Sequence, residues 1–246
     1  MSHNFARATQ AQAGEVEFAR VCSRQMDFIR PELIPDPTVR RMSLYLRQLE
    51  VFRTDGRVTV SSKQLGESLG LTDAQVRKDL TYFGSFGQPG VGYSVDEIIT
   101  RIRRVLGTDK TWNAILVGAG NLGRALLSYG GFEAKGMPIV AVFDASENKV
   151  GATIAGRTVH AMNELKSVCD AMHAKLAILA VPAEAAQEVA AQLAPAGIKG
   201  VLNFSPARLS LPPTVALQSV DLAMQLEQVT FQVSLNAMTR AGVRHP

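Results

Sequence analysis

The chain has 246 residues, of which 46% are hydrophobic and 20% are charged, and this composition is typical of a globular protein large enough for two domains. No stretch approaches the roughly 18 consecutive apolar residues of a membrane helix, and the N-terminus lacks the apolar segment of a secretory signal. The net charge is +4, and the two cysteines are far apart in the sequence with no C-x-x-C partner. We expect a cytoplasmic protein in which Cys22 and Cys169 are buried thiols, with a redox role as the alternative.

Residues 1–36 form an N-terminal arm with the weakest signal in the chain. Apolar side chains at Phe18, Cys22, Ile29 and Leu33 have helical spacing, which favours a helix near residues 15–30. A partly disordered arm is an equally good interpretation. The role of the arm stays open.

Residues 38–70 are predicted to contain two helices joined by a short strand at 58–60. The first helix follows from apolar residues at helical spacing, which are Val39, Met42, Leu46 and Leu49. Thr38 can cap this helix. The second helix opens with a capping box at Ser61–Gln64 and ends at Gly70.

A third helix follows almost directly, because Thr72–Gln75 has the form of another capping box. The two helices therefore make a helix–turn–helix. Val76, Leu80 and Phe83 must face the core, which leaves outside Gln75, Arg77, Lys78, Thr81 and Tyr82. These groups can read base edges and bind phosphates, and residues 37–110 carry 12 basic against 8 acidic residues. The alternative is a solvated helix face.

Residues 83–93 contain four glycines between aromatic residues, which favours a hairpin like the wing of a winged helix. An amphipathic helix follows over residues 96–106 and ends at Gly107. We place a domain boundary at Thr108–Thr111, the shortest candidate linker.

A glycine-rich turn then stands between a predicted strand, Ala114–Val117, and a helix. Its six residues are Gly118, Ala119, Gly120, Asn121, Leu122 and Gly123. In a dinucleotide-binding turn the first glycine allows the tight bend, the second lets the backbone approach a pyrophosphate, and the third lets helix pack on sheet. A second strand, Ile139–Phe143, ends in Asp144, which can accept the hydroxyls of an adenine ribose. The order of these features predicts a bound dinucleotide, and the acid favours NAD(H) over NADP(H).

The α/β pattern continues after Asp144. We predict helices at 163–172 and 183–193 and buried strands at 176–181 and 200–202. Ligands of such sheets lie across the carboxyl ends of the strands. Residues expected to meet the cofactor there are Val181, Pro182, Asn203, Ser205 and Pro206.

The last predicted helix, Asp221–Met238, has two apolar stripes on opposite sides instead of one. The first contains Leu222, Leu226, Val229 and Val233, and the second contains Met224, Phe231, Leu235 and Met238. A helix of this kind is packed between two bodies. Packing within one subunit is possible, but we favour a helix that reaches across a dimer.

The sequence resembles the Rex family of redox-sensing transcriptional repressors. The strings that carry the resemblance include YLRQLE at 45–50, SSKQLG at 61–66, QVRKDL at 75–80, YFGSFG at 82–87, GVGY at 90–93, GIKG at 197–200 and NFSP at 203–206. The match runs from about Pro37 to Leu235. The arm is the departure from the family pattern.

The resemblance implies an α/β protein with an N-terminal winged helix–turn–helix domain (37–107), a doubly wound Rossmann domain (111–219) and a swapped C-terminal helix (221–238). It implies a homodimer that binds an inverted-repeat operator and releases it when NADH replaces NAD⁺. To the DNA-contacting residues above it adds Ser61, Ser62 and Gly87. It also implies a relay in which Tyr129 reaches Asp221 of the partner helix, with Arg47 as the ionic partner of Asp221. Otherwise Tyr129 is a core aromatic and Arg47 a solvated or phosphate-contacting cation.

Two rival functions remain. An NAD-dependent dehydrogenase would need a proton donor or acceptor beside the nicotinamide, yet none of the four histidines lies in a recognisable catalytic motif. Only about 25 residues follow the start of the last helix, too few for a substrate domain. The other rival is a Rossmann regulatory module with an incidental N-terminal domain. We predict no catalytic residues and no metal site.

Overall fold

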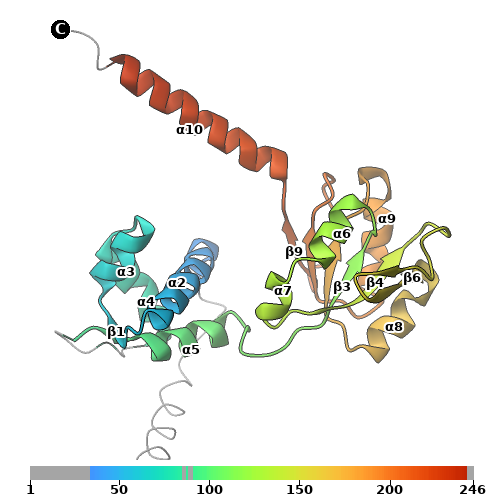
Figure 1. Cartoon of the computed structure of the whole chain (residues 1–246), viewed down its shortest axis with the longest axis horizontal. Helices are drawn as coiled ribbons and strands as arrows, with labels where there is room; N and C mark the ends of the chain where they lie inside the picture. Colours follow the sequence, from blue (N-terminus) through green and yellow to red (C-terminus); the bar gives the residue numbers. More distant parts are fainter. Residues whose placement is uncertain (1–33, 85–86, 88–90, 243–246) are drawn as a thin grey trace, which may run out of the picture. The chain divides into compact units, whose positions relative to one another are not determined.

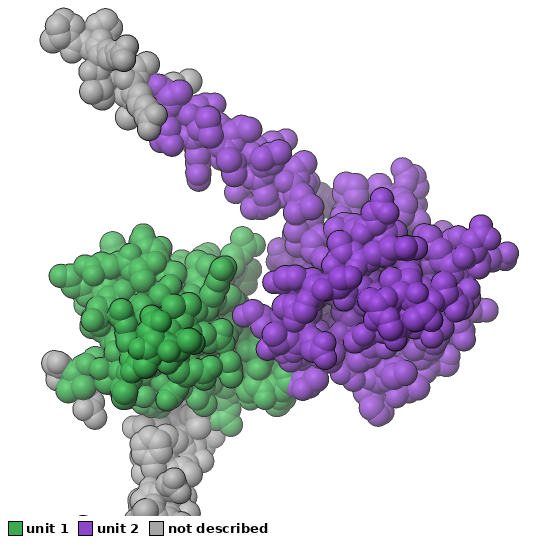
Figure 2. Space-filling view, in the orientation of Figure 1, with its two compact units in different colours: residues 1–110 green, residues 111–246 purple. Residues whose placement is uncertain are grey.

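A computed structural model describes residues 34–84, 87 and 91–242, with side chains up to residue 237. The chain divides into two compact units, residues 1–110 and 111–246, which Figure 2 shows in different colours. The helix predicted near residues 15–30 and most of the predicted wing tip lie outside the described residues. No helix in the described part of the chain is long and apolar enough to cross a membrane.

Unit 1 is a helical bundle with a small two-stranded sheet. Its elements are α2 (Asp36–Thr54), β1 (Thr59–Val60), α3 (Ser62–Leu69), α4 (Asp73–Leu80), the 3-10 helix η2 (Thr81–Phe83), β2 (Tyr93–Ser94) and α5 (Val95–Val105). Helix α2 packs on α5, and α3 packs on α4. The largest fully buried side chains of this core are Met42, Tyr45, Leu49, Leu65, Leu80, Phe83, Ile98 and Ile102.

The predicted helix–turn–helix is confirmed, and its ends are fixed by the predicted caps. The Ser61 hydroxyl accepts the N–H of Gln64, whose side chain accepts the N–H of Ser61 in return. Gly70 ends α3 with a φ of 67°, a left-handed conformation that glycine adopts without strain. Thr72 then caps α4 by accepting the N–H of Gln75, but the predicted second capping box is incomplete, because the Gln75 side chain donates to Asp79 instead of returning to Thr72.

The start of α2 differs from the prediction. The helix begins at Asp36, because Pro37 in its first turn has no N–H to leave unpaired. Thr38 therefore lies inside the helix and is buried, so its predicted role as a cap is wrong. Its hydroxyl instead donates to the carboxylate of Asp79, 3.2 Å away.

Strands β1 and β2 pair antiparallel, with Thr59 opposite Ser94 and Val60 opposite Tyr93. In the sequence, β1 comes directly before the helix–turn–helix and β2 lies at the end of the predicted wing. Gly92, with a φ of 95°, lies so close to β1 that an added Cβ would come within 2.7 Å of the Val60 carbonyl oxygen. The glycine is therefore needed where the chain enters β2 beside β1.

Unit 2 is a sheet with helices on both faces, followed by one long helix. Its elements are β3 (Ala114–Val117), α6 (Asn121–Leu127), α7 (Gly131–Ala134), β4 (Ile139–Asp144), β5 (Thr153–Ile154), β6 (Arg157–Ala161), η3 (Met162–Glu164), α8 (Leu165–Ala171), β7 (Leu176–Leu179), α9 (Ala183–Leu193), β8 (Gly200–Asn203), β9 (Ala216–Ser219) and α10 (Leu222–Gly242). The strand order is β5-β6-β4-β3-β7-β8-β9, and all neighbours pair parallel except β5 with β6.

Alternate side chains of the strands supply two separate cores. Ile115 and Val117 point to the face covered by α8 and α9, whereas Leu116 and Val142 pack with α6 and α7. Figure 1 shows the helices on the two sides of the sheet. The strand order reverses at β3, which places β4 on one side and β7 on the other. A ligand of a doubly wound sheet binds at such a switch point.

Three strands of this sheet, β5, β6 and β9, were not predicted. Strand β9 has no buried residue, and β5 is two residues long at the sheet edge. Neither shows the continuous apolar run by which the inner strands are recognised.

Helix α10 extends away from the sheet (Figure 1), and every described side chain along it is exposed. Asp221 caps it, accepting the N–H groups of Ala223 and Met224 at 2.9 and 3.0 Å. Large apolar side chains such as Leu226 and Phe231 are 65% and 66% exposed. In the single chain, both apolar stripes of α10 are therefore exposed to solvent.

Candidate functional site

The turn between β3 and α6 is shaped by two glycines with no room for a side chain. Gly118 has a φ of 102°, and an added Cβ would collide with the carbonyl oxygen of Ala180 at the end of β7. A Cβ on Gly123 would collide with the carbonyl oxygen of Gly118. The first glycine thus permits the bend beside the neighbouring strand, and the third permits the helix to pack against the turn.

Gly120 differs from the other two glycines. Its backbone is extended, with a φ of −79°, and an added Cβ would meet nothing within 4 Å. The fold therefore gives no internal reason for a glycine there. A ligand that approaches the backbone closely does give one, and a pyrophosphate is the ligand that such turns bind.

Asp144 ends β4 next to this turn and is 8% exposed. Its carboxylate accepts the N–H groups of Ala119 and Ser146, each at 2.8 Å, and the ammonium of Lys149 at 2.9 Å. Burial raises the pKa of the Asp144 carboxyl, but hydrogen bonds from Ser146, Lys149 and Ala119 outweigh it, so the pKa lies below 3.8. The group is charged at neutral pH and ties the glycine turn to the end of β4.

A cavity of about 380 Å³ opens beside Asp144 at the carboxyl ends of β4 and β6. It is lined by Asp144, Ala145, Glu147, Val150, Ala161, Met162 and Asn163. An adenosine joined to a pyrophosphate at Gly120 would point toward this end of the sheet.

On the other side of the switch point, Val181 is half-buried and Pro182 exposed at the N-terminal end of α9. Asn203 is fully buried. Its amide donates to the carbonyls of Ser205 and Ala207 and accepts the N–H of Ser205, so all its polar atoms hold the loop after β8. Asn203 therefore shapes the loop around a ligand rather than presenting its own amide.

Ser205 is 6% exposed, and its hydroxyl has no hydrogen-bond partner among the described residues. A buried hydroxyl without a partner costs about 1–3 kcal/mol. A polar group of a bound ligand or a water molecule can satisfy it. Pro206 follows at the surface. The open Gly120, the Asp144 carboxylate and the Ser205 hydroxyl fit the polar parts of a dinucleotide.

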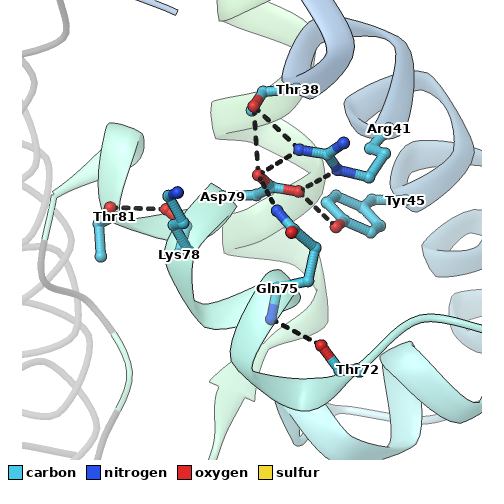
Figure 3. Close-up of polar contacts among 8 residues, drawn as sticks. All are labelled: Thr38, Arg41, Tyr45, Thr72, Gln75, Lys78, Asp79 and Thr81. Carbon is cyan, nitrogen blue, oxygen red and sulfur yellow. Dashed lines mark hydrogen bonds and ion pairs between the residues drawn. The ribbon is translucent and has the colours of Figure 1, made fainter. Parts of the chain in front are cut away.

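In unit 1, the predicted DNA-contacting side chains on the exposed face of α4 differ in how available they are to a ligand. The Arg77 guanidinium is half-exposed and already paired, at 2.6 Å, with Asp73 one turn earlier. No ion pair or hydrogen bond of the Lys78 ammonium is found among the described residues, and Figure 3 shows it directed away from the buried cluster. Lys78 is thus the cation of this helix that is most available to a phosphate.

The helical wheel used in the prediction holds only as far as Leu80. The chain continues as a 3-10 helix, in which the Thr81 hydroxyl donates to the Lys78 carbonyl at 2.6 Å. Tyr82 packs partly against the core of unit 1, while Phe83 is fully buried. Thr81 is therefore exposed as predicted, but the Tyr82 ring is only partly outside.

Asp79 was not predicted from the sequence as a functional residue, and its carboxylate is 1% exposed inside unit 1. Figure 3 shows four side chains converging on it from α2 and α4. Arg41 donates two hydrogen bonds at 2.6 and 2.8 Å, Tyr45 one at 2.7 Å, Gln75 one at 3.0 Å and Thr38 one at 3.2 Å.

This cluster changes the role expected for Gln75. One of its amide hydrogens is held by Asp79, so the side chain is fixed in one orientation with its carbonyl oxygen and second hydrogen left over. Burial raises the pKa of Asp79, but hydrogen bonds from Arg41 and Tyr45 outweigh it and leave the pKa below 3.8. The ionised carboxylate therefore locks α4 onto α2.

The remaining predicted contacts lie at the start of α3 and beside the hairpin. The hydroxyl and the backbone N–H of Ser61 both belong to the capping box. The Ser62 hydroxyl accepts a long hydrogen bond of 3.4 Å from Arg77. Gly87 is exposed, and an added Cβ would come within 2.6 Å of the Tyr93 ring.

The three relay residues are all on the surface of their own units. Arg47 is exposed on α2. Tyr129 is 60% exposed and makes an edge-on contact with Phe132, with ring centroids 5.1 Å apart, so it is not a core aromatic. Asp221 is engaged as the α10 cap.

Cys169 is buried in the α8 face of the sheet, where burial and the charge of Asp170 raise the pKa of its thiol. A buried, protonated thiol reacts slowly with oxidants. This supports the interpretation of Cys169 as a buried hydrophobe. Cys22 lies outside the described residues.

Sequence relatives identify the family. A redox-sensing transcriptional repressor Rex from Carboxydothermus hydrogenoformans is 46% identical over 200 residues, which cover 81% of this chain and 96% of the relative. The Rex repressor of Desulfitobacterium hafniense is 44% identical over a similar span, and that of Rhodopirellula baltica is 43% identical over 197 residues. The chain belongs to the Rex family of redox-sensing transcriptional repressors. The resemblance seen in the sequence is thus confirmed.

Solved structures agree with the Rex assignment. The crystal structure of RSP, a Rex-family repressor, in complex with β-NAD⁺ and operator DNA aligns with a TM-score of 0.79 at 34% identity, covering 85% of this chain and 96% of RSP. The structure of RSP with β-NADH aligns with a TM-score of 0.77 at 32% identity. The predicted α/β fold class, with an N-terminal DNA-binding domain before a Rossmann-like sheet, is confirmed.

Two family models match separate parts of this Rex chain. One is described as a putative DNA-binding protein N-terminus and matches residues 33–81. The other is described as a CoA binding domain and matches residues 109–207. The second description names a different nucleotide from the one predicted, but it covers the same glycine turn and the same strands.

Proposed function

We propose that this protein is a cytoplasmic transcriptional repressor that binds an operator through unit 1, binds NAD(H) through unit 2, and is released from DNA by NADH. The observation that carries the proposal is its 40–46% identity, over most of the chain, to proteins named as redox-sensing repressors. The RSP structures with NAD⁺ and operator DNA, and with NADH, support both ligands.

For the coenzyme, the proposed contacts divide by chemistry. The pyrophosphate lies on the backbone of Gly118–Gly123, with Gly120 as the closest approach. Asp144 accepts from the adenine ribose. Val181, Pro182, Ser205 and Pro206 surround the nicotinamide end, and Asn203 holds the loop that contains Ser205 and Pro206. NADH acts as the effector, while NAD⁺ competes for the same site.

For DNA, we propose that α4 enters the major groove of each half-site of an inverted repeat. Lys78 contacts a phosphate, and Arg77 exchanges its pairing with Asp73 for contact with DNA. Gln75, oriented by Asp79, reads a base edge with the amide atoms that remain free. Supporting contacts come from Ser61, Ser62, Thr81, Tyr82 and Gly87.

The switch requires that NADH and NAD⁺ differ in affinity for two arrangements of the protein. A ligand shifts a conformational equilibrium only by its differential affinity for the two states. The two coenzymes differ at the nicotinamide, which is neutral when reduced and positive when oxidised. An apolar wall at the ring favours the neutral form, because an unpaired buried charge is costly.

We propose that the signal passes through Tyr129, Asp221 of the partner subunit and Arg47. The exposure of Tyr129 and Arg47 on their own units is compatible with contacts in a dimer. The cap role of Asp221 matters for testing this relay, since alanine would remove both the cap and the charge. Asparagine caps helices well, so Asp221→Asn removes the charge alone.

The dimer itself is proposed to form by exchange of α10. Both stripes of this helix are exposed in the single chain, and an amphipathic helix of this kind is stabilised by packing on both sides. An apolar groove of about 360 Å³ over β7, β8 and β9, lined by residues such as Ile178, Leu202 and Leu217, gives a further surface that a second copy would cover. An isologous pair also matches an inverted repeat.

A catalytic function is not part of the proposal, since the relatives are named repressors. A hydride-transfer assay tests the dehydrogenase alternative directly. The repressor function is tested by titrating NADH at fixed NAD⁺ against a gel shift of an inverted-repeat operator. Release of DNA is expected as the NADH fraction rises, and a chain that binds no inverted repeat would refute the proposal.

A further inference from the structure

The Asp144 carboxylate has less capacity for a ribose than its position suggests. One oxygen accepts the Ser146 N–H, and the other accepts both the Ala119 N–H and the Lys149 ammonium. A carboxylate has about four acceptor positions. Three hydrogen bonds are already accepted within the chain, so Asp144 has less acceptor capacity left for a sugar than a free carboxylate has.

The Lys149 ammonium, in contrast, has more hydrogen-bond donors than its ion pair with Asp144 uses. Its ammonium carries three donors, of which Asp144 takes one, and its side chain is 36% exposed. The turn that carries it is well anchored, because the N–H of Lys149 donates to the Ser146 carbonyl at 2.9 Å and its carbonyl accepts from Ala152 at 3.0 Å. The ion pair with Asp144, at 2.9 Å, therefore places the ammonium next to the cavity that Asp144 lines.

The charge of the pair also bears on selectivity. A lone aspartate repels a 2′-phosphate, whereas an adjoining cation accommodates one. The charged residues that line the cavity are Asp144 and Glu147, and the Lys149 ammonium, which is not among the lining groups, neutralises Asp144 at 2.9 Å. Removal of the Asp144 carboxylate would leave the Lys149 ammonium next to this cavity without its ion-pair partner, where a phosphate group can pair with it.

We propose that Lys149 is a second residue that determines coenzyme specificity, with Asp144 and Lys149 acting as one unit. In the wild type, Lys149 holds Asp144 in place for the ribose and donates to the sugar. Without Asp144, its ammonium is released to bind a 2′-phosphate, and the site prefers NADPH. The inference rests on the proposed function, because it assumes that unit 2 binds NAD(H).

The test is a direct binding titration of NADH and NADPH, followed by nicotinamide fluorescence, on the full chain. Wild type should prefer NADH. Asp144→Ala should gain at least tenfold in NADPH affinity and lose NADH affinity, which reverses the preference. Asp144→Ala combined with Lys149→Met should lose that gain, because the gain depends on the ammonium.

Lys149→Met alone keeps the inference testable if Asp144→Ala fails to fold. It leaves the Asp144 charge without its cation, so the preference for NADH over NADPH should sharpen at least threefold. Lys166→Met is the matched control, since Lys166 also pairs with an aspartate, Asp170 at 3.0 Å, but on the surface of α8. Its coenzyme preference should equal that of wild type.

Two results would overturn the inference. One is an Asp144→Ala protein that binds NADH but gains no NADPH affinity. The other is a Lys149→Met protein with unchanged preference. Failure of the wild type to bind either coenzyme would instead overturn the proposed function, so the two failures are distinguishable.

Discussion

Removing the Asp79 carboxylate should destabilise unit 1 strongly, because Asp79 is the buried acceptor on which four side chains converge. Asp79→Ala leaves the Arg41 cation without its partner and the buried Tyr45 hydroxyl without an acceptor. Breaking a buried ion pair costs about 3–5 kcal/mol. The Arg41 side chain is 23% exposed, so water offsets part of the loss. We expect about 3 kcal/mol, the lower end of that range.

Two further variants serve for comparison, one that removes a single hydrogen bond and one that is a control. Tyr45→Phe removes one hydrogen bond to a charged group and keeps the ring in the core, which should cost about 1.5 kcal/mol. Asp55→Ala is the control for the charge change, because Asp55 is exposed at the end of α2 and its substitution also removes one negative charge. Surface changes of this kind stay within about 0.5 kcal/mol.

The assay is urea unfolding of the full chain, followed by circular dichroism and by tryptophan fluorescence. Trp112 is the one tryptophan of the sequence and lies in unit 2, so its emission reports that unit. With an m-value of about 1–3 kcal/mol/M, Asp79→Ala should lower the urea midpoint of the unit 1 helices by about 1–3 M. The Trp112 transition should move much less.

The pH dependence has a definite sign. A carboxyl whose folded pKa is lowered stabilises the fold above its unfolded pKa, and this stability is lost as the pH falls through the folded value. The difference in unfolding free energy between wild type and Asp79→Ala should therefore shrink below pH 3.8. An Asp79→Ala protein with wild-type stability at pH 7, or a difference that grows in acid, would refute the role assigned to the cluster.

Five other changes have definite expected outcomes. Lys78→Ala should weaken operator binding and lower the slope of log affinity against log salt by about one unit, since one phosphate contact is lost; an unchanged slope removes Lys78 from the interface. Gly120→Ala should keep wild-type stability yet bind NADH at least tenfold more weakly, whereas Gly123→Ala should unfold at lower urea because its Cβ meets the Gly118 carbonyl. Deletion of residues 221–246 should abolish the dimer in light scattering, and a dimeric truncation would contradict helix exchange. Asp221→Asn should bind NADH normally but release less DNA at a given NADH concentration, and full release would leave the relay without support.

Much of the fold was predictable where the cause is local. The Ser61–Gln64 capping box and the left-handed Gly70 depend on residues within a few positions of one another, so the boundaries of α3 follow from the sequence. The glycine turn was predictable for a related reason. Gly118 and Gly123 are required by contacts that any strand–turn–helix of this kind makes.

The missed features depend on contacts between distant parts of the chain. Asp79 lies on the core side of α4, three residues after Val76, but its partners Arg41 and Tyr45 are 38 and 34 residues away. Only the packing of α2 against α4 reveals them. An acidic residue among apolar positions of a helical wheel was the available signal.

Lys149 was missed because the turn after β4 has no pattern that predicts where its side chain points. The exposed strand β9 was missed because the parallel pairing with β8 alone defines it. In both cases the sequence specifies the feature through tertiary contacts that short-range periodicity cannot report.

The central claim is that NADH and operator DNA bind to different arrangements of one protein, and reciprocal binding tests it most directly. The affinity for NADH is measured by titration with and without saturating operator, and the affinity for operator with and without saturating NADH. Linkage requires both affinities to fall by the same factor, and a coupling of 1–3 kcal/mol, typical of allosteric proteins, corresponds to roughly 5–150-fold. A common factor in this range is the predicted result. Tight binding of both ligands with a factor of one would contradict the account.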